Sequence, residues 1–214
     1  GMDSIALTDH GNLYGAVEFY KTCKAADIKP IIGIETYVAP KDHTEKTSNG
    51  EKYYHLILLA KNQTGWKNLI QLSTKAALYG FYYKPRIDKN LLRQHSEGLI
   101  GLSACLAGEI SRLLTTNNYQ KAIETAKEYE NILGKGNFYI EIGHHPGIPE
   151  TTKIREWLIK LSKETNIPIV ATQDIHYQCE VDRVVRILNL KDDLPSEKQQ
   201  RQIRGRFSQL LTRL

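Results

Sequence analysis

Two short polar motifs place carboxylate and imidazole side chains directly after apolar segments. Asp9 and His10 end one apolar run, and Asp174 and His176 end another. Side chains two residues apart on an extended strand point to the same side, so Asp174 and His176 are able to face one ion together. This combination at strand ends predicts a hydrolytic metal site acting on a phosphoester. The alternative for each motif is a strand-terminal turn with hydrogen-bonded side chains.

Other strand-like segments supply candidate metal ligands as well. Glu35 lies late in a second apolar run, His55 begins a third, and Cys105 follows a fourth. Mixed imidazole and carboxylate ligands suit Zn²⁺, Mn²⁺ or Fe ions. Taken alone, Glu35 is equally well a strand-edge carboxylate, and Cys105 a small buried hydrophobe. His55 starts its strand, which in a simple parallel barrel would put it at the wrong pole. His43 and His95 lack supporting context and are expected to be exposed.

Residues 79–86 form a basic and aromatic stretch that contains Lys84 and Arg86 among several tyrosines. Such a mixture is able to hold a phosphate or to stack on a nucleobase. The alternative is a packed loop whose cations lay their aliphatic stems over apolar surface.

The composition is that of an ordinary globular protein, with 41% hydrophobic and 25% charged residues in a chain of 214. This length predicts one sizeable domain. The formal charge of +5 permits a polyanionic partner without requiring one. Three scattered cysteines form no disulfide framework, which favours a reducing cytoplasm. The chain has no apolar run of about 18 residues and no signal peptide, so neither membrane spanning nor export is expected.

Strand-like and helix-like segments alternate from end to end. Strands are expected at 4–9, 30–38, 53–60, 98–103, 137–142 and 167–172. Helices are expected at 13–26, 64–79, 108–114, 119–133, 149–165 and 180–190. Such alternation predicts a parallel sheet with outer helices, in which functional side chains gather at the carboxyl ends of the strands. We favour a (β/α) barrel over an open doubly wound sheet.

Four segments, in this order and spacing, resemble the PHP (polymerase and histidinol phosphatase) domain in the alpha subunit of bacterial replicative DNA polymerase III: 5–20, 29–35, 101–109 and 171–177. The resemblance covers about residues 1–180. It implies an α/β fold, a distorted (β/α)₇ barrel, here missing its first strand. Residues 1–190 would be the PHP domain, incomplete at its N-terminus, and 191–214 a linker or tail.

The resemblance also implies a ligand set: His10, Glu35, His55, Cys105, Asp174 and His176. It implies catalytic roles for Asp9, His10 and Asp174, with Asp9 orienting His10. The cofactors would be divalent ions (Zn, Mn or Mg), up to three in the family. Fewer are expected here, because the family's opening strand with its His-x-His pair has no match. Lys84 and Arg86 are the candidates for binding phosphate or nucleic acid.

The resemblance implies part of a cytoplasmic DNA-directed DNA polymerase that acts in replication. Its partners would be DNA, the remainder of the alpha subunit and other replisome subunits, with no membrane involved. The PHP domain itself would be a metal-dependent phosphoesterase or 3′–5′ exonuclease, impaired in this chain. The alternatives are a non-catalytic scaffold for polymerase and proofreading partners, and a free-standing phosphatase for small phosphoesters.

Overall fold

The computed structural model describes three ranges of the chain: 3–46, 53–143 and 148–175. The chain divides into two compact units, Gly1–Gln173 and Asp174–Leu214. All helices and strands below belong to the first unit. The helix expected at 180–190 lies outside the described residues.

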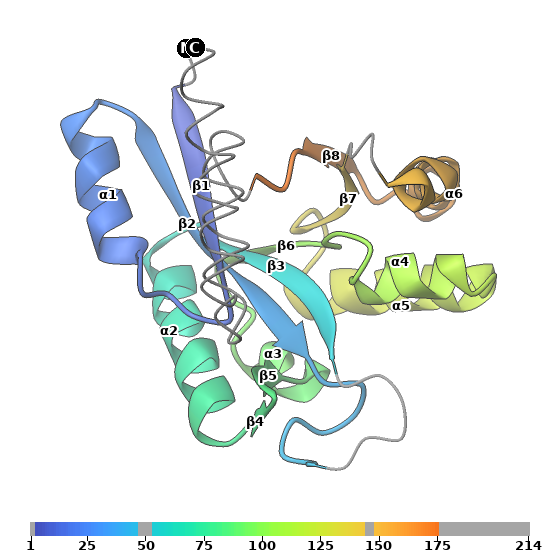
Figure 1. The fold of residues 1–214 in the computed structure, drawn as a ribbon, viewed down its shortest axis with the longest axis horizontal. Helices are drawn as coiled ribbons and strands as arrows, with labels where there is room; N and C mark the ends of the chain where they lie inside the picture. The colour runs from blue at the N-terminus through green and yellow to red at the C-terminus, as the bar shows by residue number, and fades with distance from the viewer. Residues whose placement is uncertain (1–2, 47–52, 144–147, 176–214) are drawn as a thin grey trace, which may run out of the picture. The chain divides into compact units, whose positions relative to one another are not determined.

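The first unit contains both strands and helices, which Figure 1 colours from blue to red in the order of the chain. The strands are β1 (Ser4–His10), β2 (Lys29–Val38), β3 (Tyr54–Ala60), β4 (Phe81–Tyr82), β5 (Lys84–Ile87), β6 (Leu99–Leu102), β7 (Phe138–Gly143) and β8 (Ile169–Thr172). The helices are α1 (Ala16–Ala25), α2 (Gln63–Leu78), α3 (Lys89–Gln94), α4 (Glu109–Thr115), α5 (Tyr119–Leu133) and α6 (Pro149–Thr165). The six expected strands are confirmed, whereas the short β4–β5 hairpin was not predicted.

The strands form one mixed, curled sheet in the order β4-β5-β2-β3-β6-β7-β8, with β1 paired to β2. Strand β2 is its centre, because it pairs in parallel with both β1 and β5 and antiparallel with β3. Strands β1 and β5 follow one another along the same edge of β2, since β3 occupies the opposite edge. The architecture is a curled α/β sheet, as expected for part of a PHP barrel.

The expectation of an all-parallel sheet is wrong for β3, which runs antiparallel to both β2 and β6. Within residues 39–46 and 53, the described part of the connection, no helix separates β2 from β3. Parallel neighbours require a crossover connection, whereas antiparallel neighbours can be joined directly. The reversal places the start of β3 beside the end of β2, where His55 pairs with Tyr37.

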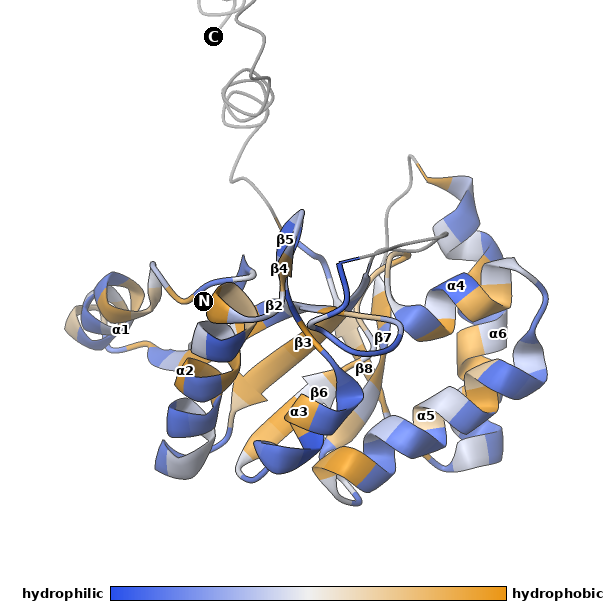
Figure 2. Cartoon of the chain, turned by 90° about the horizontal axis from the view of Figure 1, so that it is seen from below, coloured by the Kyte–Doolittle hydropathy of each residue, from blue (hydrophilic) through white to orange (hydrophobic). Residues whose placement is uncertain are grey.

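Alternation along the strands divides their side chains between two faces of the sheet. On β3, Leu56 and Leu58 join the main core beneath the helices, while Ile57 belongs to a smaller cluster on the opposite face with Leu102 and Ala104. Figure 2 shows hydrophobic strands between helices of mixed hydropathy. We call the face that carries Ile57 the inner face; it also carries the polar side chains described below.

The helices pack on the sheet in two groups. Helix α1 contacts β2 and helix α2 contacts both β2 and β3, whereas α5 and α6 contact β7 and each other. The Asn62 side chain caps α2 by accepting a hydrogen bond of 2.9 Å from the Gly65 N–H. Gly65 is required at this point, because a Cβ there would lie 1.9 Å from the carbonyl oxygen of Gly98. The start of α2 is thereby held against the turn before β6.

Candidate metal centre

A buried carboxylate joins two imidazoles on the inner face of the sheet. Glu35, on β2, is only 4% exposed. Its Oε1 lies 3.0 Å from Nδ1 of His10 and 2.5 Å from Nδ1 of His55. His10 is the direct register partner of Glu35 across β1 and β2, and His55 arrives from the antiparallel β3. Three strands therefore bring these three predicted ligands together.

The electrostatics of this group follow from its hydrogen bonds. Burial opposes ionisation of Glu35, but the hydrogen bonds and charges of His10 and His55 outweigh it and lower its pKa to about 2. Burial likewise opposes protonation of His55, yet its contacts with Cys105 and Glu35 raise its pKa to about 9. At neutral pH the metal-free protein therefore holds a carboxylate against an imidazolium that must lose its proton before it binds a metal.

The chain turns sharply directly after His10, the last residue of β1. Gly11 has a φ of +69°, in the left-handed region, and its N–H donates to the Glu35 carbonyl at 2.9 Å. A Cβ on Gly11 would lie 2.8 Å from Cε2 of Tyr37 and 3.0 Å from Cγ of Pro85. The glycine that follows His10 thus permits close packing of this loop against the neighbouring strands.

Cys105 is brought in by a tight loop after β6. Ala104 takes a left-handed conformation at φ 61°, and a Cβ on Gly108 would lie 2.2 Å from the Ser103 carbonyl oxygen. The His55 N–H donates to the Ala107 carbonyl at 3.0 Å, which fixes the loop to the start of β3. As a result, Sγ of Cys105 lies 3.8 Å from Nδ1 of His55.

The Asp9 side chain lies on the opposite face of the sheet from His10. Neighbouring residues of a strand point to opposite faces, and Asp9 pairs in register with Ile34, whose side chain belongs to the main core. Its Oδ2 accepts a hydrogen bond of 3.3 Å from the Gly15 N–H, just before α1. This placement does not support the expectation that Asp9 orients His10; it supports a role in joining β1 to α1.

Two further ligands, Asp174 and His176, are predicted after β8. Asp174 has a φ of 46° and belongs to the second unit. His176 lies outside the described residues. Their roles as metal ligands, and the catalytic role expected of Asp174, stay predictions.

The placement of Arg86 does not support phosphate binding, because the residue is only 2% exposed. Its Nη2 donates to the carbonyls of His43 at 3.0 Å and Glu45 at 2.6 Å, and its Nε to Gly80 at 3.1 Å. The guanidinium also lies 4.9 Å from the ring centroid of Tyr82. The alternative of a packed loop describes this residue: Arg86 fixes the segment after β2 to the β4–β5 hairpin.

Lys84, in contrast, is exposed and lies beside the candidate centre. Its Nζ is 5.8 Å from the ring centroid of Tyr37, and that ring is 5.3 Å from the ring of His55. Lys84 therefore stays a candidate for binding phosphate.

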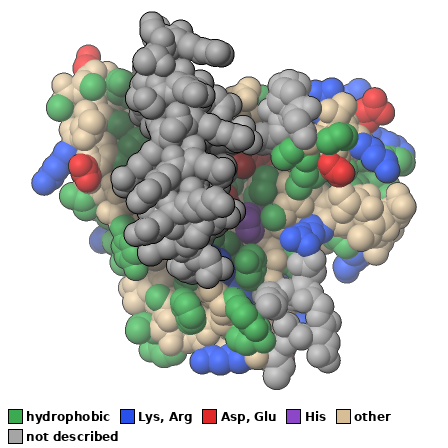
Figure 3. Space-filling model, viewed as in Figure 1, with side chains coloured by type: hydrophobic (Ala, Val, Ile, Leu, Met, Phe, Trp, Pro, Cys, Tyr) green, Lys and Arg blue, Asp and Glu red, His purple; other side chains and the backbone are tan. Residues whose placement is uncertain are grey.

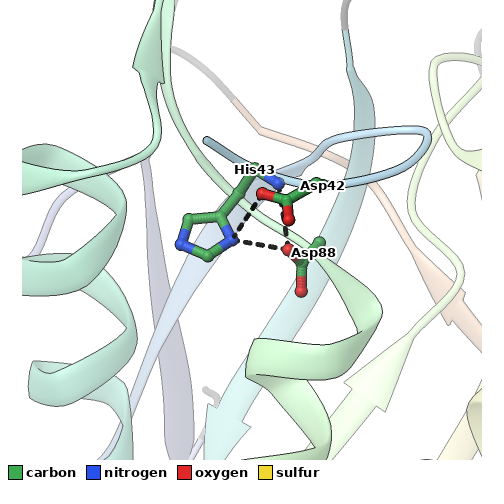
Figure 4. Close-up of side chains that lie close together, drawn as sticks. All are labelled: Asp42, His43 and Asp88. Atoms are coloured by element: carbon green, nitrogen blue, oxygen red, sulfur yellow. Dashed lines mark hydrogen bonds and ion pairs between the residues drawn. The ribbon is translucent and has the colours of Figure 1, made fainter. Parts of the chain in front are cut away.

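A second group of possible ligands, drawn in Figure 4, was missed in the sequence: Asp42, His43 and Asp88, whose ligand atoms all lie within 4.8 Å of one another. His43 is half-buried, contrary to expectation, with its Nδ1 2.5 Å from Oδ2 of Asp88. Asp88 also accepts from the His43 N–H at 2.9 Å and caps α3 by accepting from the Leu91 N–H. These bonds already satisfy Asp88, so the group is explained as an anchor for the loop. No local sequence signal pairs residues so far apart in the chain.

The residues around Glu35 fit a divalent metal ion by their chemistry. Two imidazoles, a carboxylate and a thiol are donors that Zn²⁺ and related ions accept. The ionised Glu35 would compensate positive charge in a place where an isolated carboxylate would be costly to bury. Four of the predicted ligands are thus linked by contacts: His10 and His55 with Glu35, and Cys105 with His55.

Comparisons with known proteins agree with this architecture. A profile of the PHP domain matches residues 1–145. The chain is 47% identical over 188 residues to "DNA polymerase III subunit alpha" of Treponema pallidum, which covers 87% of this chain and 16% of the relative. Proteins of the same name are 48% identical in Borreliella burgdorferi, over 82% of this chain and 15% of the relative, and 45% identical in Thermus aquaticus, over 81% and 14%.

The chain thus spans about 15% of the length of these relatives. Within the described ranges, no helix combines the length and apolarity needed to cross a membrane. The profile covers more than half of the chain, and the curled α/β sheet carries the predicted ligands of three strands and one loop on its inner face. The chain belongs to the PHP domain family.

Proposed function

We propose that this chain is the PHP part of a replicative DNA polymerase alpha subunit and holds a metal-dependent phosphoesterase centre. The observation that carries the proposal is the contact of Glu35 with both His10 and His55, with Cys105 next to His55. The names of the relatives support the replicative context. DNA, the rest of the alpha subunit and other replisome subunits are the partners proposed with it.

Bound divalent ions would supply Lewis-acid chemistry to a phosphoester. The protein's own contribution is to hold the ligands. Glu35 is fixed by the sheet and keeps the Nδ1 atoms of His10 and His55 turned toward one carboxylate oxygen. His55 gives up its proton when it becomes a ligand, and Glu35 is already ionised at neutral pH. Asp174 and His176 would complete the set.

Elemental analysis of the purified 214-residue chain tests this centre, after dialysis against Zn²⁺ or Mn²⁺. We expect Glu35→Gln and His10→Asn to lower the metal content by about one ion or more per chain, because each removes a ligand. The matched control is His43→Gln, in the loop anchor, which should keep the metal content of the wild type.

Two outcomes would contradict the proposal. If His43→Gln loses the metal while both centre variants keep it, the ion belongs to Asp42, His43 and Asp88. If the wild type holds no metal at all, the scaffold alternative explains the domain. For metal-loaded protein, hydrolysis of single-stranded DNA compared with a small phosphomonoester separates the exonuclease from the free-standing phosphatase.

A further inference from the structure

Beside the candidate centre lies a group of aromatic side chains that the proposed hydrolysis does not use. Tyr53 and His55 have nearly parallel rings, at 10°, with centroids 6.1 Å apart. Tyr37 packs edge-on against both, at 4.9 Å from Tyr53 and 5.3 Å from His55. We call Tyr37 and Tyr53 the aromatic wall; it borders the side of the centre formed by β2 and β3.

The two tyrosines differ in accessibility. Tyr37 is only 5% exposed, and burial followed by the charge of Glu35 raises its pKa to about 12, so its phenol is neutral. Tyr53 is half-buried, just before β3. Tyr37 is therefore the inner support of the wall, and Tyr53 is the member that a ligand can reach.

A single cation completes the group. Lys84 is exposed on β5, with its Nζ 5.8 Å from the centroid of Tyr37. Arg86, two residues on, is buried and bonded to backbone carbonyls, so within residues 79–86 the accessible positive charge next to the wall belongs to Lys84. Among the described side chains visible in Figure 3, Lys and Arg are scattered and form no continuous basic patch. The distribution of positive charge on this face therefore does not by itself predict binding of a polyanion.

The partly accessible ring of Tyr53 and the cation of Lys84 both lie against Tyr37. This pairing of a ring with a cation matches a nucleotide unit, which offers a base to stack and a phosphate to neutralise. We propose that Tyr53 and Lys84 form a subsite for single-stranded nucleic acid, in which a base stacks on Tyr53 and the adjoining phosphate meets Lys84. This inference rests on the proposed function, because it names the substrate class of that centre. Tyr37 acts as a positioning residue that keeps the Tyr53 ring beside His55.

Binding of a labelled oligothymidylate to the 214-residue chain, measured by fluorescence anisotropy in EDTA, tests the subsite without hydrolysis. We expect Tyr53→Leu to weaken binding about 5- to 100-fold, and Tyr53→Phe to restore it, because the stacking surface is kept. Lys84→Gln should reduce the slope of log affinity against log salt by about 0.7. The matched controls are Tyr20→Leu on α1 and Lys121→Gln on α5, both exposed and expected to bind as the wild type does.

An oligomer of abasic residues with the same number of phosphates separates stacking from charge. Tyr53→Leu should leave its binding unchanged, whereas Lys84→Gln should weaken it. The subsite is overturned if the wild type does not bind oligothymidylate, if Tyr53→Leu binds it as the wild type does, or if Tyr53→Leu also weakens the abasic oligomer equally.

Failure of the proposed function would look different. Hydrolysis of bis(4-nitrophenyl) phosphate, which has no nucleobase, reports on the metal centre alone. If that hydrolysis is absent while oligothymidylate binding still depends on Tyr53, the centre fails and the subsite stands. If hydrolysis is present and Tyr53→Leu binds normally, the subsite fails and the centre stands.

Discussion

At the scale of single residues, the local environment decides what each side chain does. Lys84 and Arg86 stand two positions apart in one basic stretch, yet Lys84 is exposed and Arg86 is buried among backbone carbonyls. Glu35 is also buried, but its partners are imidazoles, which makes it part of a candidate site. Residue type alone does not separate these cases.

The Glu35–His55 pair predicts a pH dependence of stability in the metal-free protein. The pKa of Glu35 is lowered to about 2, so its contribution is present above its ordinary 4.5 and is lost as the pH falls toward 2. The pKa of His55 is raised to about 9, so its contribution is present below 6.5 and is lost as the pH rises through 9. The stability difference between wild type and Glu35→Gln should therefore be largest between pH 4.5 and 6.5.

Urea unfolding in EDTA at acidic, mildly acidic and alkaline pH measures this difference. The free energy of unfolding of Glu35→Gln is subtracted from that of the wild type at each pH. Titrating groups that the substitution does not affect contribute equally to both proteins and cancel. A difference that stays constant across the pH range would contradict the pairing of Glu35 with His55.

Arg86→Lys should destabilise the protein by about 2–4 kcal/mol. Lysine cannot reproduce the planar fork, so buried carbonyls of the loop after β2 lose their charged donor. Thermal unfolding should show a Tm lower by about 5 °C or more. Lys84→Gln is the matched control, since an exposed substitution is expected to change stability by about 0.5 kcal/mol or less. Equal Tm values for both variants would show that the hydrogen bonds of Arg86 add nothing to stability.

At the scale of the elements, strand direction builds the candidate centre. The antiparallel β3 carries His55 to the end of β2, and the left-handed Gly11 lets the residues after β1 pack on Tyr37. The loop after β6 is fixed to the start of β3 by the hydrogen bond from His55 to Ala107. Two of these connections thus bring imidazoles to Glu35, and the third brings Cys105 to His55.

Gly11→Ala tests how closely the loop after β1 must pack. Both Gly11 and Gly136 have positive φ, at +69° and +79°, but a Cβ on Gly136 would meet nothing within 4 Å. Gly136→Ala should therefore cost only the conformational penalty of about 1–2 kcal/mol. Gly11→Ala should cost more and should also reduce the metal content, because the added methyl displaces Tyr37 or shifts the chain directly after His10. Equal free energies of unfolding for the two variants would rule out the close contact.

At the scale of the whole molecule, the described fold is one curled α/β unit, and the chain spans about 15% of the relatives that it matches. The proposed activity belongs to the inner face of this unit. The roles proposed for the polymerase and its partners concern a much longer protein. The domain boundary expected at residue 190 stays a prediction.

If the centre binds metal, the stability of the whole unit should rise with the concentration of free ion. A ligand that binds only the folded state stabilises it by about 2.7 kcal/mol at 100 times its Kd. Increasing Mn²⁺ or Zn²⁺ should therefore raise the Tm of the wild type and of His43→Gln, as measured by thermal unfolding. The Tm of Glu35→Gln should rise much less. A Tm shift that survives in Glu35→Gln would place the stabilising ion outside the centre.

The sequence by itself determined the types of the candidate ligands, the order of the main strands and helices, and the resemblance to the PHP domain. These are properties of local pattern and of short motifs, so they are legible without coordinates. The resemblance implies His10, Glu35, His55 and Cys105 as ligands, and in the structure Glu35 contacts both imidazoles while Cys105 contacts His55.

Only the tertiary structure decided which residues are neighbours and which are buried. Strand β3 runs antiparallel, so His55 lies at the end of β2 although it starts its own strand. Arg86 is buried, Asp9 bonds to the residue before α1, and His43 pairs with Asp88. The tertiary structure also placed Lys84 and Tyr53 around Tyr37. The physical reason is that strand direction, register and burial depend on pairings between distant segments, and no local pattern of side chains specifies them.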